Sequence, residues 1–419
     1  MQFLLVGPVN PFLNLVNVDS GSETMVAWKL AQGSNCQARG SSVLCGGAWA
    51  LEIPTRYGPK NVSHIGECTM SDELKELRIS NEAIDDPAEL RRRIAAEGYL
   101  FFKQLQVPDK LWDLRRKMMT IIQKVGWLVA DKDPIDGIAD ITAQCTEGDN
   151  AYSAGYAEVY KLEAFHRSAH WPEVTSMVEK IMGQPIMPHP HKVARIWFPK
   201  YTKHTTPVHQ DFVHFQGNFE TLTCWAPVGD CPIELGGLAI IPGSHKVNRV
   251  LEHRFSLGAG GLVVDTDAHS EIDPVWHTTD YEIGDTLFFP SLTIHKALPN
   301  YTEDRLRLSL DNRYHAIGYP VAEHMLLPHG PSQLQWDDIY PHWQSEDLKY
   351  YWKKYDNPIV PRDMSYAEKG FVDALDLARA GNIDAIFTLK RVIKNDPVSS
   401  NGLTAMRVLQ EIGISADRQ

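Results

Sequence analysis

The sequence predicts a mainly β core with flanking helices, built as a double-stranded β-helix of the jelly-roll or cupin-like type. From about residue 190 to 320, short apolar runs follow one another: KVARIWF, FETLTCWAPV, GLAIIPG, GDTLFFPS and RLRLSLDNRYH. Turn-forming pairs such as Pro-Gly, Gly-Asp and Pro-Asn separate these runs. Because no helical pattern lies between them, the strands fit a sandwich or barrel and not a parallel α/β sheet.

Helices are expected on the N-terminal side of this core, from about residue 72 to 185. Asp86 and Pro87 provide a cap and a first-turn proline for a helix that Gly98 ends. After the short β-like run YLFFK, apolar residues recur at helical spacing. This stripe consists of Leu111, Leu114, Met118, Ile121, Ile122 and Val125, and a second stripe consists of Val174, Met177, Val178 and Ile181. We expect both stripes to be core.

The chain divides into three expected parts. Residues 1–70 are rich in Gly, Ser and Asn and predict irregular or short-stranded structure packed on the body. Residues 71–330 hold the β-helix with its flanking helices, and residues 331–419 form a helical extension. In that extension, Ser365 and Glu368 suggest a capping box at the start of a helix. The helical tail either buttresses the body or forms a homodimer contact.

Composition excludes several classes of protein. The 419 residues are 43% hydrophobic and 22% charged, which is typical of a globular protein. The net charge of −12 makes nucleic acid, which needs a clustered basic surface, a poor candidate partner. The sequence contains no run of eighteen apolar residues, so it predicts no membrane span. No basic residue precedes Lys29, which argues against a secretory signal. We therefore expect neither a membrane anchor nor a secretory signal but a cytoplasmic protein.

Six cysteines without a CxxC pair make a structural zinc site improbable. They fit scattered, mostly buried thiols of a reducing compartment. A disulfide between Cys36 and Cys45 is the minor alternative.

The segment PVHQDFVHFQ and the later segment GDTLFFPSLTIH together suggest a metal site. In a strand, residues two apart share a face, so His209 and Asp211 would present an imidazole and a carboxylate side by side. Alone, such a pair is a weak signal. His295 follows a separate apolar strand and supplies a second imidazole. Two histidines and one carboxylate on one face hold Fe(II) and leave coordination positions open for a co-substrate and dioxygen.

The strand after His295 carries a candidate anion site. Arg305, Arg307 and Ser309 alternate on one strand face. An arginine can grip a carboxylate through two parallel hydrogen bonds, and a serine two residues later adds a donor. Such a pair is what a pocket for the distal carboxylate of 2-oxoglutarate requires. Either arginine could fill the role; Arg307 is favoured because Ser309 completes an Arg-x-Ser pair.

These motifs, together with TCWAPVGDCPIELGGLAIIPGSHK at 223–246, resemble the phytanoyl-CoA dioxygenase family over roughly residues 85 to 320. The resemblance implies a double-stranded β-helix oxygenase that uses Fe(II), 2-oxoglutarate and O2 and produces succinate and CO2. It implies that His209, Asp211 and His295 are the catalytic metal ligands. At the 2-oxoglutarate site it implies Arg307 and Trp225, with Ser309 or Thr223 as alternative donors of a further hydrogen bond to the co-substrate. Ala297 departs from the family, which often has a hydroxyl residue there.

The resemblance also bears on the reaction. Related halogenating enzymes lack the carboxylate, so Asp211 favours hydroxylation or another C–H oxidation such as desaturation. A cupin-like metal-dependent isomerase or a 2-oxoglutarate-independent dioxygenase would need the triad but not the arginine strand. A non-catalytic binding relative would usually have lost a ligand, and all three are present.

The substrate is expected to be a small organic molecule selected by the loops at 130–165 and 247–280. The first loop is polar and Gly-rich, which suits a lid. No basic cluster marks a site for coenzyme A phosphates, so we favour a specialised metabolite over an acyl-CoA. His214 would face away from the metal in a regular strand, His245 is expected in a structural turn, and Arg195 is expected either to serve packing or to point into the pocket.

Overall fold

The computed structural model describes residues 74–415 and, nearer the N-terminus, the backbone of five strands. The chain forms two units, residues 1–69 and 70–419. In the first unit the five strands pair in sequence order as an antiparallel meander: β1 (Leu13–Ser20), β2 (Glu23–Leu30), β3 (Asn35–Arg39), β4 (Ser42–Leu44) and β5 (Ala50–Glu52). The short strands expected in this segment are therefore present. The Cys36 and Cys45 side chains lie outside the described residues.

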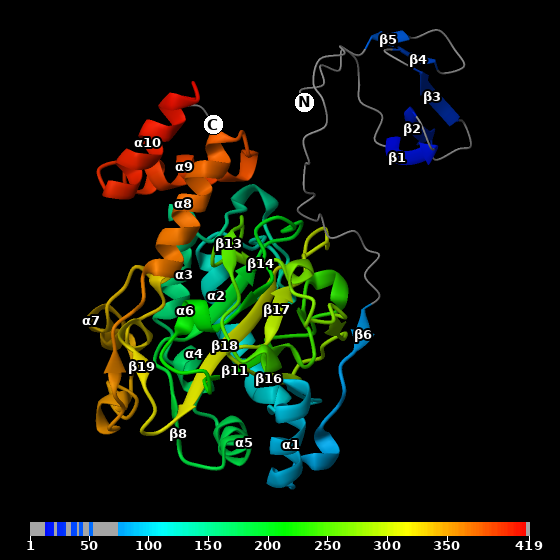
Figure 1. Ribbon diagram of the computed structural model, residues 1–419. Helices are drawn as coiled ribbons and strands as arrows, with labels where there is room; N and C mark the ends of the chain where they lie inside the picture. The colour runs from blue at the N-terminus through cyan, green and yellow to red at the C-terminus, as the bar shows by residue number, and fades with distance from the viewer. Residues whose placement is uncertain are drawn as a thin grey trace. The chain divides into compact units, whose positions relative to one another are not determined.

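Two sheets form the core of the second unit, as the sequence predicted for a double-stranded β-helix (Figure 1). The first has the order β10 (His209–Gln210), β17 (Ile294–Ala297), β12 (Leu238–Ile240), β15 (His277–Thr278) and β6 (Lys75–Glu76). The second has the order β7 (Leu100–Phe102), β16 (Thr286–Pro290), β11 (Leu222–Pro227), β18 (Arg307–Ala316) and β8 (Ile186–Pro188), with β9 (Val193–Trp197) also paired to β18. All of these pairs except β15–β6 are antiparallel. Neighbouring strands come from distant parts of the sequence, which brings His209 and His295 onto adjacent strands.

The N-terminal flanking helices follow the predicted signals. The Asp86 side chain accepts hydrogen bonds from the second and third residues of α1 (Pro87–Glu97), and Gly98 ends that helix with a φ of 75°. The predicted apolar stripe of α2 (Pro108–Lys124) is buried at Leu111, Leu114, Met118 and Ile122. The stripe of α5 (Pro172–Met182) is buried in the same way. These helices supply core, as expected.

The prediction of a polar lid at 130–165 is wrong for its second half. Residues Asn150–Tyr160 form helix α3, which α4 (Glu163–Ser168) follows. Tyr152, Tyr156 and Tyr160 recur every fourth residue, so they share one helix face, and all three are buried. Tyr152 stacks on Trp127 with ring centroids 5.6 Å apart. Gly155 lets that indole approach, since a Cβ there would lie 2.3 Å from a Trp127 ring atom. The tyrosine hydroxyl groups make this segment look polar in the sequence, although the tyrosine rings form a stripe of the core.

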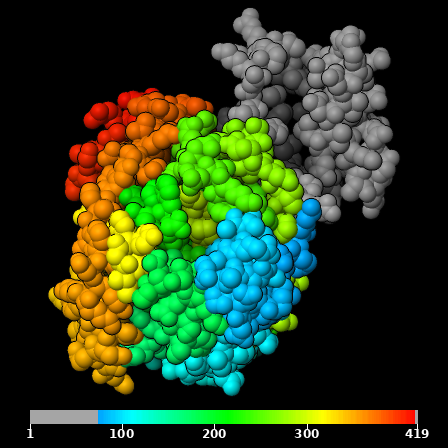
Figure 2. Space-filling view, turned by 60° about the horizontal axis from the view of Figure 1, so that its bottom comes forward, coloured from blue at the N-terminus to red at the C-terminus, as the bar shows by residue number. Residues whose placement is uncertain are grey.

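After the barrel, the chain runs along the body and ends in three helices. Short elements come first: β19 (Val321–Ala322), α7 (Trp336–Ile339) and β20 (Ile359–Val360). The helices α8 (Ser365–Arg379), α9 (Ile383–Asn395) and α10 (Ser400–Glu411) then share an apolar core of their own. Figure 2 shows this C-terminal part, orange to red, along one side of the unit beside green segments. The predicted capping box is wrong, because Met364 is the cap and Ser365 donates its backbone N–H to Asp363.

The remaining strands β13 (His253–Phe255) and β14 (Leu262–Val264) form a hairpin against which α8 packs. The short helix α6 (Phe212–Phe215) follows β10. Within residues 74–415, no helix combines the length and the apolar character that a bilayer span needs.

Candidate metal centre and its cavity

His209 and His295 face each other across neighbouring strands. They are direct partners in the β10–β17 pairing, and their ring centroids lie 4.1 Å apart. The Nδ1 of His209 lies 2.8 Å from the Pro207 carbonyl oxygen, and that of His295 lies 3.0 Å from the Thr293 carbonyl oxygen. A carbonyl oxygen can only accept, so each Nδ1 carries a proton and donates it. Nε2 is then the nitrogen of each ring that would bind a metal.

Asp211 completes the group from a position that the sequence pattern did not predict. The strand β10 ends at Gln210, and Asp211 has helical φ and ψ of −57° and −29° at the start of α6. Its Oδ1 nevertheless lies 3.4 Å from Nε2 of His209 and 3.6 Å from Nε2 of His295. One ligand atom from each residue lies within 4.8 Å of the other two, and all three residues are buried. Two imidazole nitrogens and one carboxylate oxygen fit Fe(II) with open coordination positions.

Two side chains hold the carboxylate of Asp211 in place. The hydroxyl of Thr223 on β11 donates to Oδ2. Nη2 of Arg313 on β18 donates to both oxygens, at 2.9 Å from Oδ2 and 3.2 Å from Oδ1. Burial alone would raise the pKa of Asp211, but Arg313 and the two imidazoles outweigh it and hold the pKa well below its usual value. The carboxylate is therefore ionised, and its Oδ1 faces the histidines.

Sequence reasoning missed Arg313, although a signal for it exists. Arg307 and Arg313 are six residues apart, an even number, and therefore share a face of β18. Ser309, Asp311 and His315 stand on the same face, and every residue of this strand is buried. A row of polar side chains on a fully buried strand is unusual for packing alone and marks the inside of a site.

Arg307 presents a guanidinium that forms no ion pair with the described residues. The residue is 1% exposed, and none of its three nitrogens makes a hydrogen bond to the described residues. Its guanidinium stacks on Trp197 at 4.2 Å and lies 5.5 Å from the ring of Trp225. Burial lowers the pKa of Arg307, which the neighbouring Cys231 thiol partly counteracts. Because an unpaired buried cation is costly, this geometry fits a carboxylate-bearing ligand.

The neighbouring residues decide between the two candidate arginines. Arg305 is exposed, whereas Arg307 is buried. The hydroxyl of Ser309 and the indole N–H of Trp225 are also buried and lack hydrogen-bond partners among the described residues. The structure thus places two further unused donors near Arg307. The hydroxyl of Thr223, by contrast, is already given to Asp211.

A cavity of about 210 Å³ opens beside the three candidate ligands. Ala297 lines it and packs on Trp197, the indole that stacks on Arg307. Arg307 and Ser309 are not among the residues that line the cavity. His214 does line it, with its ring 5.4 Å from that of His209. The expectation that His214 faces away is wrong because the chain turns into α6 at Asp211.

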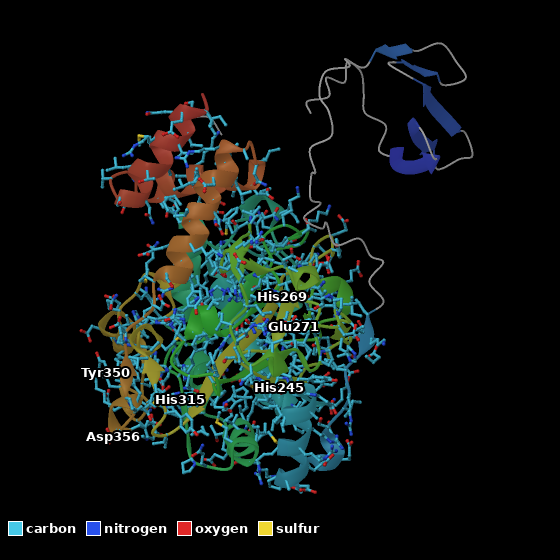
Figure 3. All side chains as sticks on the ribbon, in the orientation of Figure 1. His245, His269, Glu271, His315, Tyr350 and Asp356 are labelled. Carbon is cyan, nitrogen blue, oxygen red and sulfur yellow. The ribbon has the colours of Figure 1, made fainter. Side chains whose placement is uncertain are left out.

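Both loops expected to select the substrate reach this cavity. Glu147 comes from the first, and Ala259 and Gly260 come from the second. Arg195 on β9 also lines the cavity and pairs with Glu147 at 2.6 Å. Of the two roles that the sequence left open for it, packing or a place in the pocket, the structure gives the second. His245 lies near α1, where its Nε2 contacts the Ala95 carbonyl oxygen at 3.1 Å, as expected for a structural residue (Figure 3).

The C-terminal helices hold the loop that carries Glu147. Nη1 of Arg391 on α9 donates to the Glu147 carbonyl oxygen at 3.1 Å, and Nδ2 of Asn395 donates to the Gly148 carbonyl oxygen at 2.9 Å. The predicted role of the tail as a buttress is therefore visible at this loop. Neither contact could be read from the sequence, because the partners lie more than 240 residues apart.

The fold and the site define a class of protein. A double-stranded β-helix with two histidines, one carboxylate and a buried unpaired arginine has the parts of a non-haem iron, 2-oxoglutarate-dependent oxygenase. The chain belongs to the phytanoyl-CoA dioxygenase family, whose sequence model, described as phytanoyl-CoA dioxygenase (PhyH), matches residues 95–308, just over half of the chain. It is accordingly an Fe(II)- and 2-oxoglutarate-dependent oxygenase that acts on a small molecule.

Two curated relatives and one solved structure illustrate the similarity. A 1-deoxypentalenic acid 11-beta-hydroxylase from Streptomyces exfoliatus is 24% identical over 264 residues, 58% of this chain and 86% of the relative. A probable phytanoyl-CoA dioxygenase from Caenorhabditis elegans is 25% identical over 234 residues, 52% of this chain and 71% of the relative. The non-heme alpha ketoglutarate dependent carbocyclase SnoK from nogalamycin biosynthesis is 19% identical, with a TM-score of 0.40, over 57% of this chain and 85% of that one.

Proposed function

We propose that His209, Asp211 and His295 hold the iron of this oxygenase and that Arg307 with Ser309 binds the distal carboxylate of 2-oxoglutarate. The observation that carries the proposal is the buried guanidinium of Arg307, whose three nitrogens lack hydrogen-bond partners among the described residues. The triad alone would serve a cupin-like isomerase or a 2-oxoglutarate-independent dioxygenase equally well. A buried arginine without a counter-ion needs an anion, and 2-oxoglutarate supplies one.

The protein residues have distinct tasks in this arrangement. The Pro207 and Thr293 carbonyls keep both imidazoles turned toward the metal position. Arg313 and Thr223 orient Asp211, so we assign Thr223 to the metal side and not to the 2-oxoglutarate contacts. The indole of Trp225 borders the carboxylate pocket. When bound, iron with 2-oxoglutarate and O2 supplies the oxidising power that removes hydrogen from a C–H bond, with succinate and CO2 as co-products.

We further propose that the reaction is hydroxylation of a small specialised metabolite, with desaturation as the alternative outcome. The relative from Streptomyces exfoliatus hydroxylates 1-deoxypentalenic acid, which is a small organic acid. The cavity of about 210 Å³ favours a small molecule over a long acyl chain. The carboxylate of Asp211 occupies the position that a halide would need.

Oxygen-dependent succinate formation tests this proposal. With Fe(II) and 2-oxoglutarate, the protein is expected to consume O2 and release succinate slowly alone and faster with substrate. Arg307→Ala is expected to abolish succinate formation at ordinary 2-oxoglutarate concentrations, whereas the exposed control Arg305→Ala retains it. Succinate formation that is independent of added iron, or lost equally in both variants, would refute the assignment.

We also propose a cytoplasmic location and a homodimer formed through α8–α10. Exposed apolar side chains on or beside these helices support the dimer, among them Ile383 at 79% and Val398 at 81% exposure. The molar mass from light scattering distinguishes monomer from dimer. Even a weak dimer forms at a chain concentration of about 0.1 mM. A monomeric mass at that concentration would therefore contradict the proposal.

A further inference from the structure

Part of the cavity wall is built by the chain beyond the segment that matches the family. His324, His329, Gly330, Pro331 and Arg362 line the cavity, and all lie after residue 308. The iron end therefore belongs to the family segment, whereas much of the substrate side belongs to the extension of this chain. The chemistry of that wall bears on the substrate, and a substrate assigned from it rests on the proposed function.

When each carboxylate of the cavity lining is paired with an arginine of the lining, one arginine has no carboxylate partner among the described residues. Glu147 and Asp311 both face Arg195, at 2.6 and 3.5 Å, and Asp211 faces Arg313. These are the three carboxylates of the lining. Arg362 is exposed at the cavity, and no described carboxylate forms an ion pair with its guanidinium. Glu323, its neighbour in space, accepts only the Arg362 backbone N–H, at 3.2 Å.

Two imidazoles of the histidine wall, by which we mean His191, His324 and His329 of the cavity lining, present hydrogen-bond acceptors. Nδ1 of His191 lies 3.1 Å from the Leu327 carbonyl oxygen, and Nε2 of His324 lies 2.8 Å from the His214 carbonyl oxygen. Each of these nitrogens must donate, because a carbonyl oxygen only accepts. The other nitrogen of each ring is then an acceptor, and in His324 it is buried without a partner among the described residues. Burial lowers the pKa of both residues, that of His191 to about 3, so both rings are neutral at pH 7.

A third imidazole presents a donor. Nδ1 of His329 lies 2.9 Å from the hydroxyl of Tyr156, which itself accepts the Ala194 backbone N–H at 3.2 Å. The tyrosine hydroxyl therefore gives its own hydrogen to Nδ1, which leaves the proton of the neutral ring on Nε2. Burial keeps the pKa of His329 well below its usual value, so the ring stays neutral. The wall thus offers two acceptors and one donor beside a free cation.

We propose that the substrate is a small hydroxylated carboxylic acid, with its carboxylate on Arg362 and at least one hydroxyl on the histidine wall. A hydroxyl group can donate to the free nitrogen of His191 or His324 and accept from His329, which a ketone or a hydrocarbon cannot do. The planar guanidinium suits a carboxylate, which it can bind through two parallel hydrogen bonds. Coenzyme A, with its several phosphates, would call for more unpaired cations than the lining holds.

A binding experiment separates these features. The probes are a fixed set of hydroxylated carboxylic acids, the primary amide of each acid, and the analogue of each acid that lacks the hydroxyl. Dissociation constants are measured by calorimetry under argon on the full chain with Fe(II) and 2-oxoglutarate. The matched variants are Arg362→Gln and Arg407→Gln; Arg407 is an exposed arginine on α10 that does not line the cavity.

At least one acid is expected to bind with a Kd of about 1 mM or better. Its amide and its deoxy analogue are each expected to bind about tenfold more weakly, the factor that one charge-assisted or well-placed hydrogen bond supplies. Arg362→Gln removes the preference for the acid over the amide, and Arg407→Gln keeps it. Equal binding of acid and amide, an unchanged preference in Arg362→Gln, or no binding by any acid overturns the proposal. A separate titration of 2-oxoglutarate into the Fe(II)-loaded chain tests the proposed function, whose failure appears as the absence of a binding signal there.

Discussion

The Thr223→Val substitution tests which of two ligands the Thr223 hydroxyl serves. Valine has nearly the shape of threonine, so the substitution removes the hydroxyl and little else. In the structure this hydroxyl donates to Oδ2 of Asp211, and Arg313 remains as the second donor at 2.9 Å. The sequence instead allowed Thr223 to donate to 2-oxoglutarate in place of the hydroxyl residue that Ala297 replaces. The two possibilities predict opposite effects on the affinities for metal and co-substrate.

The expected effect is on the metal. A hydrogen bond to a charged group contributes about 1.5–3 kcal/mol to stability, so the unliganded protein should lose free energy of unfolding within that range. Without the hydroxyl the carboxylate can rotate, and losing such a supporting contact typically weakens metal binding about 10- to 100-fold. That factor corresponds to about 1.4–2.7 kcal/mol. Affinity for 2-oxoglutarate, measured with the metal site saturated, should stay nearly unchanged.

Fluorescence competition with a chelator gives the Fe(II) affinity, and anaerobic titration gives the 2-oxoglutarate affinity. The matched control is Ser309→Ala, which removes a buried hydroxyl near Arg307 that has no partner among the described residues. This control should weaken 2-oxoglutarate binding and leave the metal affinity intact. If Thr223→Val weakens 2-oxoglutarate binding and spares the metal, the assignment of Thr223 to Asp211 is refuted.

Three further outcomes are expected. Gly155→Ala should destabilise the fold by about 1–3 kcal/mol, because the added methyl would collide with the facing indole; a raised urea midpoint would contradict this. Burial lowers the pKa of both His166 and His191 from 6.5 to about 3. Below pH 6.5 the unfolded chain therefore binds protons that the folded chain does not, so stability is kept above that pH and falls below it. The loss is about 1.4 kcal/mol per histidine at about pH 5.5, and substitution of either by a neutral isostere should flatten the curve of unfolding free energy against pH. Finally, Arg391→Ala should speed amide hydrogen exchange in the loop around Glu147 while leaving iron affinity unchanged, and equal exchange in the variant and wild type would argue against the α9 contact.

The sequence predicted the architecture, and the three residues of the candidate triad do come together, for identifiable physical reasons. Alternating apolar runs with turn residues between them report strands, and strands that lie far apart in sequence meet in a double-stranded β-helix. The prediction of Arg307 over Arg305 agrees with burial: Arg307 is enclosed and Arg305 is exposed. The alternation of Arg307, Ser309, Asp311 and Arg313 on one face extends the same pattern along the strand, and it carries the signal for Arg313 too.

Other features could not be predicted because they depend on backbone geometry or on distant contacts. Strand periodicity placed His214 on the wrong side, since nothing in the sequence announced the helical turn at Asp211. A hydroxyl such as that of Thr223 can serve either a carboxylate or a ligand, and only its position decides. The substrate wall comes from His324 and Arg362, which follow the barrel in sequence and return to the cavity. The periodicity of a sequence indicates which face of a helix or strand is buried, but not which residues that face contacts.

The most direct measurement is the anaerobic visible spectrum of the Fe(II)-loaded protein on addition of 2-oxoglutarate. If the triad and Arg307 form one site, wild type develops the absorbance band of 2-oxoglutarate chelated to Fe(II). His295→Ala then fails to develop the band, Arg307→Ala needs about 100-fold more 2-oxoglutarate, and Arg305→Ala behaves as wild type. No band in wild type, or a full band at the same 2-oxoglutarate concentration in His295→Ala and Arg307→Ala, would contradict the proposed site.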